Sequence, residues 1–221
     1  MGTILVLCTK YKVRKGILGG FSGKVGTVVG ASWRGISYIR SLPQKVRNPR
    51  SDGQRSQRNK FSLVVSLLKP MNALLRVGWK LYAHRQSPFN AATAYTLANA
   101  ITGTYPDYEI DVSKVLVSRG SLTPAANAKA TVTSGNIVLS WNDNSGIGAA
   151  KPTDKALIAV INPIKDETIT NAAGADRSAG TQTVVIPDAW SGDSVDVYLG
   201  FVSEDGREVA NSSYLGSIAI D

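Results

Sequence analysis

A glycine-rich run at residues 19–25 partly matches the sequence motif of a phosphate-binding loop. A P-loop requires G-x-x-x-x-G-K followed by Ser or Thr, because backbone N–H groups cradle the phosphates and the hydroxyl binds magnesium. Leu18 stands at the position of the first glycine, and Val25 stands where the hydroxyl residue belongs. The sequence therefore does not predict a nucleotide site here.

Metal-binding and nucleophilic side chains are scarce in this chain. His84 is the only histidine and Cys8 the only cysteine, so neither a zinc cluster nor an intrachain disulfide is expected. A Ser-His-acid set would have to use His84, which we expect to be solvated near a helix end. The acid pairs at 166–167 and 204–205 fall in predicted turns, where carboxylates are usually solvated. We predict no catalytic residue, no metal, no cofactor and no enzymatic activity.

Cations are the chemically active groups that do gather in this sequence. Residues 10–60 contain thirteen Lys and Arg against one acid, Asp52. Solubility is better served by mixed charges, so this imbalance favours a surface for phosphates or for an acidic protein partner. Aromatic side chains among the cations could stack on bases. The candidate binding residues are Arg34, Arg40, Lys45, Arg47, Arg50, Arg55, Arg58, Lys60, Trp33 and Tyr38.

The charge differs in sign between the two halves of the chain. Residues 1–119 carry a net charge of +15 and residues 120–221 a net charge of −6, within a total of +9. Such asymmetry is typical of two domains with different partners. We predict a basic, glycine-rich strand and helix module at residues 1–110 and a β-sandwich at residues 111–221.

The basic module begins with short β-prone segments between glycines. We expect strands at residues 25–29 and 31–39, joined by turns in which glycine supplies positive φ. In a strand over 31–39, Trp33 would lie on one face with residues 35, 37 and 39. Tyr38 and Arg40 would lie on the other face with residues 34 and 36, as a basic and aromatic stripe.

Two helices are expected after Asn48-Pro49. Ser51 and Gln54 have the spacing of a capping box, so the first helix should begin at Ser51. Pro70 should kink or split it. A second helix is predicted over 88–101, with Ser87 as cap and Gly103 as stop. The first helix carries an apolar stripe that we interpret as core, formed by Phe61, Val64, Val65, Leu68, Met71, Leu75, Trp79 and Tyr82.

Beyond residue 110 the hydrophobic period changes to two. Strands are expected at residues 112–117, 128–133, 137–141, 156–161, 181–186, 195–202 and 214–220, with turn residues between them. Seven short strands at this spacing favour an immunoglobulin- or fibronectin-like β-sandwich, with Trp141 in its core. The predicted fold class is therefore α+β and multidomain.

Membrane insertion is not expected from this sequence. No apolar run approaches the roughly 20 residues that a membrane span needs. The apolar run at residues 4–8 lacks a preceding basic residue and a small residue at the processing position, so we expect a short strand there and not a secretion signal.

Three stretches of the sequence resemble a family of uncharacterised proteins from Bacteroidota and their phages. They are the run from Gly16 to Gly30 continued by residues 33–35 and 40–43, the Asn48-Pro49-Arg50-Ser51 motif with the glutamines and cations that follow, and residues 197–206 with 213–216. The first fifteen residues depart from the family's usual short opening. The resemblance implies a bacterial or phage context and a structural or assembly role, and it implies no catalytic residue.

We therefore expect a structural protein of a virion or a prophage-encoded particle. Its partners would be other assembly subunits, with DNA as a further candidate, in a homo-oligomer located in the virion or the bacterial cytoplasm. The alternative is a cytoplasmic nucleic-acid-binding protein, whose phosphate contacts would make its affinity fall steeply with salt. A third hypothesis is a carbohydrate-binding sandwich, with Trp141, Trp190 or Tyr198 as stacking platforms. The sequence leaves the partner's identity and the stoichiometry open.

Overall fold

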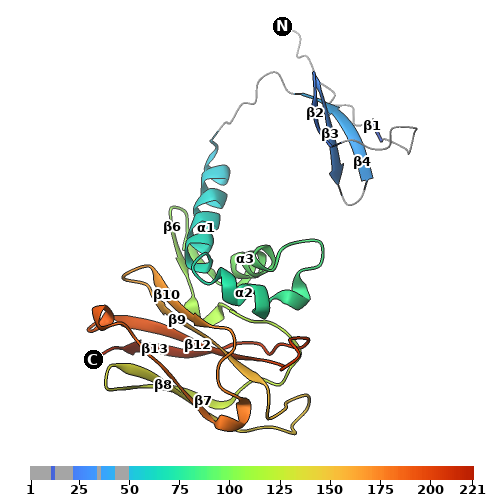
Figure 1. The fold of residues 1–221 in the computed structure, drawn as a ribbon. Helices are drawn as coiled ribbons and strands as arrows, with labels where there is room; N and C mark the ends of the chain where they lie inside the picture. Colours follow the sequence, from blue (N-terminus) through green and yellow to red (C-terminus); the bar gives the residue numbers. More distant parts are fainter. Residues whose placement is uncertain (1–10, 13–21, 34–35, 43–49) are drawn as a thin grey trace. The chain divides into compact units, whose positions relative to one another are not determined.

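The computed structural model describes residues 11–12, 22–33, 36–42 and 50–221 (Figure 1). Contacts divide the chain into two compact units, Met1–Arg50 and Ser51–Asp221. The fold is mixed, with helices and mostly antiparallel sheets. The predicted domain boundary at residues 110–111 falls inside the second unit. The P-loop look-alike apart from residues 22–25, and the strand expected at residues 4–8, lie outside the described residues.

The first unit contains a small antiparallel sheet. Its strands are β1 (Tyr11–Lys12), β2 (Gly23–Val25), β3 (Val28–Trp33) and β4 (Ile36–Ser41), in the spatial order β1-β4-β3-β2. Gly26, with φ +59°, allows the two-residue turn that joins Val25 to Val28. The strands predicted at 25–29 and 31–39 are wrong in extent, because the first is interrupted by this turn and the second is divided into two paired strands.

The second unit begins with a helical layer: α1 (Asp52–Leu68), α2 (Asn72–Gly78), the short 3-10 turn η1 (Lys80–Tyr82) and α3 (Pro88–Asn99). The break predicted at Pro70 is confirmed, and α1 and α2 are bent by 89° across it. The cap predicted at Ser87 is also confirmed. Its side chain accepts a hydrogen bond from the backbone N–H of Asn90 at 3.1 Å, with Pro88 in the first turn.

The helix start predicted at Ser51 is confirmed, because Ser51 is the N-cap of α1, but the predicted capping box is wrong. Ser51 makes no side-chain capping hydrogen bond, and because residues 51–55 are exposed, water can satisfy the N–H groups of the first turn. Gly103 does not stop α3, which ends at Asn99. With φ +80°, Gly103 lies in a hairpin of β5 (Ile101–Thr104) and β6 (Asp107–Ile110), where a Cβ would collide with the carbonyl oxygen of Asp107.

Two antiparallel sheets complete the second unit. One has the order β10-β9-β12-β13 and the other β11-β8-β7. Six of the seven predicted strands are confirmed within two residues at each end, and the 181–186 strand ends at residue 184. A strand at residues 167–171, which we expected to begin in a turn, was missed. The strands are β7 (Ala126–Thr133), β8 (Asn136–Asn142), β9 (Lys155–Asn162), β10 (Glu167–Asn171), β11 (Thr181–Val184), β12 (Ser194–Val202) and β13 (Ser213–Ala219).

The two central strands of the four-stranded sheet, β9 and β12, are buried on both faces. Along β12, every second side chain from Val195 to Phe201, including Val197 and Leu199, packs in the core with the three-stranded sheet. Tyr198 and Val202, on the opposite face, belong to a core shared with the helices. Strand β9 alternates in the same way. Trp141 of β8 is 4% exposed in the core between the sheets, as predicted. The unit therefore has three layers, with the helices over one side of the larger sheet (Figure 1).

The strand predicted at residues 112–117 is wrong. Residues 112–114 form a 3-10 turn, and residues 115–119 run as a connector between the helices and the sheets. The indole N–H of Trp79 donates to the carbonyl oxygen of Leu116 at 3.1 Å, and the backbone N–H of Val117 donates to the Ser212 hydroxyl at 2.9 Å. The backbone N–H and C=O groups of the connector thus find partners in side chains, so the segment does not need a neighbouring strand to satisfy them.

Candidate partner-binding surfaces

One face of the β2-β3-β4 sheet combines cations with aromatic side chains. Directly paired residues of antiparallel strands share a face, and the pairs are Lys24 with Val29, Val29 with Arg40, Ala31 with Tyr38, and Trp33 with Ile36. We call this set the basic face: Lys24, Val29, Ala31, Trp33, Ile36, Tyr38 and Arg40.

The prediction that Trp33 lies opposite Tyr38 and Arg40 is wrong. It assumed one continuous strand, whereas β3 and β4 pair with each other and bring Trp33 to the same face as Ile36. Trp33 is 62% exposed and Ile36 is 43% exposed. The structure therefore joins the aromatic and cationic candidates of this unit more closely than the sequence indicated.

The charge of the basic face has no compensating acid among the described residues of its unit. Within the described part of residues 22–42 there is no Asp or Glu, and Lys24 and Arg40 form no ion pair among the described residues. The Nε of Arg40 is shielded from solvent and has no hydrogen-bond partner in the described chain. A guanidinium in this state gains stability from any anion placed beside it.

The N-terminal part of α1 forms a second basic surface, in the other unit. Arg55 and Arg58 are exposed, while Lys60 is half-buried with its Nζ 4.6 Å from the centre of the Tyr108 ring. Tyr108 also shares a hydrogen bond of 2.7 Å with the Ser56 hydroxyl, so β6 supports this part of the helix. The two arginines are thereby presented to solvent from a fixed helix.

The remaining candidates are placed as follows. Arg34, Lys45 and Arg47 lie outside the described residues. Arg50 is exposed, with φ +47°, at the end of the first unit. The structure thus groups Trp33, Tyr38 and Arg40 on one sheet face and Arg55, Arg58 and Lys60 on one helix.

An open groove of about 700 Å³ lies along α1 and α3. Its apolar residues include Phe61, which is 54% exposed although the sequence analysis assigned it to the core. Tyr82, at the other end of that stripe, is 40% exposed, whereas Val64, Leu68, Met71, Leu75 and Trp79 are buried as predicted. The groove has basic but no acidic lining residues: Gln57, Arg58, Phe61, Ser62, Val65, Ser66, Lys69 and Leu97.

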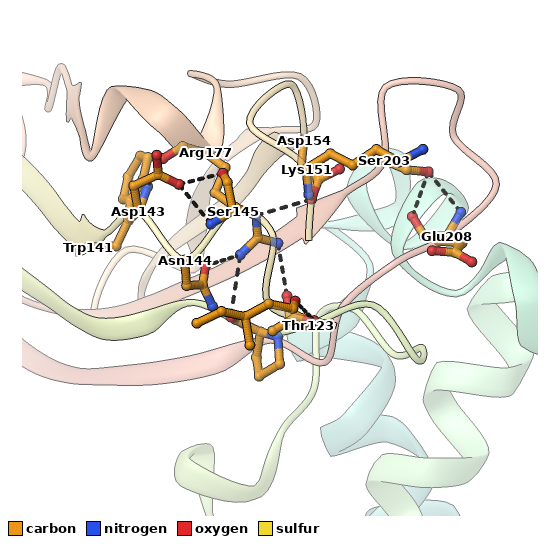
Figure 2. A network of polar contacts seen from close by, with 12 residues as sticks. Thr123, Trp141, Asp143, Asn144, Ser145, Lys151, Asp154, Arg177, Ser203 and Glu208 are labelled. Atoms are coloured by element: carbon orange, nitrogen blue, oxygen red, sulfur yellow. Dashed lines mark hydrogen bonds and ion pairs between the residues drawn. The ribbon is translucent and has the colours of Figure 1, made fainter. Parts of the chain in front are cut away.

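A buried ion pair in the sandwich was missed by the sequence analysis. Arg177 and Asp154 have fully buried side chains, and the Nε of Arg177 donates to Oδ2 of Asp154 at 3.1 Å (Figure 2). The other guanidinium nitrogens donate to Oδ1 of Asn144 at 2.6 Å and to the carbonyl oxygen of Thr123 at 2.9 Å. Nothing in the spacing of these residues along the chain indicates that they meet.

This network ties loops together and has the properties of a structural site. The indole N–H of Trp141 donates to the carbonyl oxygen of Arg177 at 2.7 Å, and the guanidinium lies 4.0 Å from the centre of the Phe201 ring. Burial lowers the pKa of Arg177, while the hydrogen bond and charge of Asp154 oppose that shift. The buried guanidinium of Arg177 thus has its hydrogen-bond and charge partners within the protein itself.

The hypothesis of a carbohydrate-binding sandwich is wrong, because its three proposed stacking residues are buried. Trp141, Trp190 and Tyr198 are at most 4% exposed, so none of them can stack on a sugar ring. Tyr198 donates its hydroxyl to the carbonyl oxygen of Val112 at 2.7 Å, and Trp190 donates its indole N–H to Glu167 at 2.8 Å. Burial raises the pKa of the Tyr198 phenol above its ordinary value.

The described residues offer little support for a histidine-based catalytic site, a metal site or a membrane span. His84 is exposed just after η1, as expected. The described residues contain no group of three or more His, Cys, Asp and Glu side chains that could hold a metal ion. No single helix in the described ranges has the length and apolar character to cross a membrane, and only α1 and α2 taken together pass that test, across their bend.

Comparison with known proteins gives a match for most of the chain. No curated protein matches it. The model of a family described as "Family of unknown function (DUF6266)" matches residues 20–216.

Proposed function

The chain belongs to the DUF6266 family of unknown function, and we propose that it is a non-enzymatic structural or assembly protein that binds its partners through its basic N-terminal part. Its setting would be a phage or prophage-encoded virion, which rests on the resemblance to phage and Bacteroidota proteins. The partners would be neighbouring subunits or packaged nucleic acid. The alternative is a cytoplasmic nucleic-acid-binding protein that uses the same cations.

The basic face is the observation that carries this proposal. It presents Lys24 and Arg40 together with exposed Trp33, without any acid in the described part of residues 22–42. Cations of this kind bind phosphates or carboxylates, and aromatic side chains stack on bases or fill apolar pockets. Arg55 and Arg58 on α1 add exposed positive charge in the second unit.

Subunit contact is supported by the groove along α1 and α3. It offers exposed Phe61 beside the cationic side chains of Arg58 and Lys69. Such a combination suits a protein segment that carries both apolar and acidic side chains. Nucleic acid would use the cations there and would leave the apolar floor uncovered.

The C-terminal part of the proposal is an immunoglobulin-like sandwich that faces a partner or solvent. If the seven strands from β7 to β13 are taken as A, B, C, C′, E, F and G, the sheets become ABE and C′CFG. This order resembles the two sheets of immunoglobulin-like folds, although the core tryptophan Trp141 lies on strand B and the core tryptophan of antibody domains lies on strand C.

A salt titration of DNA binding separates the two kinds of partner. If nucleic acid is bound, fluorescence anisotropy with a short single-stranded and a short double-stranded DNA should show affinity that falls with salt. About three to four neutralised phosphates would give roughly a 20- to 200-fold loss between 50 and 200 mM salt. Reversing Lys24 and Arg40 of the basic face to Glu should weaken binding, as should reversing Arg55 and Arg58 of α1, whereas the exposed sandwich cation Lys129→Glu should leave it nearly unchanged.

The outcomes distinguish the proposals. A response that is flat in salt, or losses for the basic-face and α1 variants no larger than for Lys129→Glu, would argue against nucleic acid as the partner. Mass spectrometry of purified particles then tests the assembly role. Absence of the chain from particles produced by cells that express it would count against a virion component and leave the cytoplasmic alternative.

A further inference from the structure

The second unit carries charge of opposite sign on its two parts. Residues 51–119, which hold the helices, the β5–β6 hairpin and the connector, contain nine Lys and Arg against four acids. Residues 120–221, which hold the two sheets, contain six Lys and Arg against twelve acids. Both parts belong to one compact unit (Figure 1). Such a distribution favours contact between the positive part of one copy and the negative part of another.

The groove along α1 and α3 lies on the positive part. Phe61, 54% exposed, lines it together with the cations Arg58 and Lys69, and no acid lines it. Lys69 is exposed and forms no ion pair among the described residues. A segment that fits this groove therefore carries an apolar side chain for Phe61 and acids for the two cations.

The N-terminal fifty residues do not supply this combination. They contain ten Lys and Arg and neither Asp nor Glu. Apolar side chains from this part could cover Phe61, but it has no acid for Arg58 and Lys69 and would add further positive charge. The occupant that complements the whole groove comes from outside these residues.

The turn between β9 and β10 has the required composition. Ile164 is 68% exposed, and the exposed acids Asp166 and Glu167 follow it within three positions. The cation between them, Lys165, is paired with Asp193 at 2.7 Å within the sandwich. The turn thus presents an apolar side chain beside net negative charge, which is the chemical complement of the groove.

This turn is held in shape by its own hydrogen bonds. Oδ1 of Asn162 accepts from the backbone N–H groups of Ile164 and Lys165, at 3.0 and 3.1 Å. The amide nitrogen of Asn162 donates to Oδ2 of Asp193 at 2.8 Å, and Lys165 donates to the same oxygen. A preorganised loop loses little conformational entropy on binding, so this turn is suited to insertion into a groove.

We propose that the β9–β10 turn of one copy of this chain binds in the α1–α3 groove of the next copy. Ile164 packs against Phe61, and the two acids of the turn lie beside Arg58 and Lys69. The two surfaces differ, so the contact is head-to-tail and its repetition gives a ring or a filament. The inference rests on the proposed assembly function, and it identifies a neighbouring subunit as another copy of this chain.

Two exposed isoleucines of the sandwich make the test specific. The full-length chain, freed of nucleic acid by nuclease, should self-associate in sedimentation velocity, and more weakly at high salt. Ile164→Asp should weaken the association about thirtyfold or more, because it replaces the apolar anchor of the contact by a charge. The matched control is Ile147→Asp, which changes a 63% exposed isoleucine of another loop and should leave the association unchanged.

Mixing two defective variants tests the head-to-tail geometry. Phe61→Asp disables the groove and Ile164→Asp disables the turn, so each variant alone should stay monomeric where the natural chain associates. An equimolar mixture should form dimers and nothing larger, because one intact groove and one intact turn remain. A symmetric contact would give no such rescue.

The contact and the proposed function can fail separately. A monomeric full-length chain, equal losses for Ile164→Asp and Ile147→Asp, or a mixture without dimers would overturn the contact. If such a chain is still found in purified particles, the assembly function stands and another protein fills the groove. A chain that passes these tests but is absent from particles keeps the contact and loses the virion setting.

Discussion

At the scale of single residues, the Arg177–Asp154 pair shows how a buried charge can be structural. Taking both ions out of water is costly, and a buried pair is stable only when further hydrogen bonds satisfy the remaining polar atoms. Arg177 obtains them from Asn144 and from backbone carbonyl oxygens. Oδ2 of Asp154 also accepts from the backbone N–H of Lys151, whereas Oδ1 of Asp154 has no hydrogen-bond partner in the described chain. The pair therefore fixes the loops around it in one arrangement.

Removing one partner of this pair should be strongly destabilising. Arg177→Met leaves Asp154 buried without its cation, which costs about 3–5 kcal/mol, while the double variant Arg177→Met/Asp154→Leu should recover much of the loss. The control is Arg207→Met, which removes an exposed pair with Asp205 and should change little. Urea unfolding followed by tryptophan fluorescence measures all three, and equal losses for Arg177→Met and Arg207→Met would contradict this account.

At the scale of elements, pairing decides which side chains act together. Read as one strand, residues 31–39 would place Trp33 and Tyr38 on opposite faces. Paired as β3 and β4, they share a face with Arg40. The same residues thus form a mixed cationic and aromatic surface only because the chain reverses direction between the two strands.

The two predicted helix caps allow a matched test. Ser87→Ala should lower the free energy of unfolding by about 1 kcal/mol, because it removes the side-chain acceptor for the N–H of Asn90. Ser51→Ala should have almost no effect, since the Ser51 side chain makes no capping bond. Chemical denaturation of both variants checks the difference, and a larger loss at Ser51 would mean that α1 is capped in solution.

At the scale of the molecule, the helices and sheets of residues 51–221 form one folding unit. Leu157, Ala159 and Tyr198 of the larger sheet are buried in the core that contains Leu75 and Trp79 of the helical layer. The connector at 115–119 adds backbone contacts to both layers, and a Cβ on Gly78 or Gly200 would collide with it. This core cannot be divided without exposing apolar surface.

Truncation tests this unity. A fragment of residues 51–221 should unfold in one cooperative transition. A fragment of residues 111–221 should bind a hydrophobic dye and lose its near-ultraviolet circular dichroism, because the helix-facing side of β9 and β12 would be uncovered. A shorter fragment with native-like spectra and sharp unfolding would instead support the boundary predicted at residue 110.

Local sequence signals predicted much of this protein. Pro70 interrupts the helix whatever the surrounding tertiary structure is. Ser87 caps α3 through a hydrogen bond within the first turn of that helix. The alternation of apolar and polar residues locates most of the sandwich strands. The crowding of cations before residue 60 is a property of composition and needs no fold. These features depend on neighbours a few residues apart.

The tertiary structure decided the rest, because the rest depends on partners far apart in the chain. Arg177 and Asp154 are 23 positions apart and meet only when three loops converge. β9 and β12 are apolar on both faces because the helices cover one side and a second sheet covers the other. Composition made the N-terminal part cationic, but only strand pairing set Trp33, Tyr38 and Arg40 on one face and left the other face neutral.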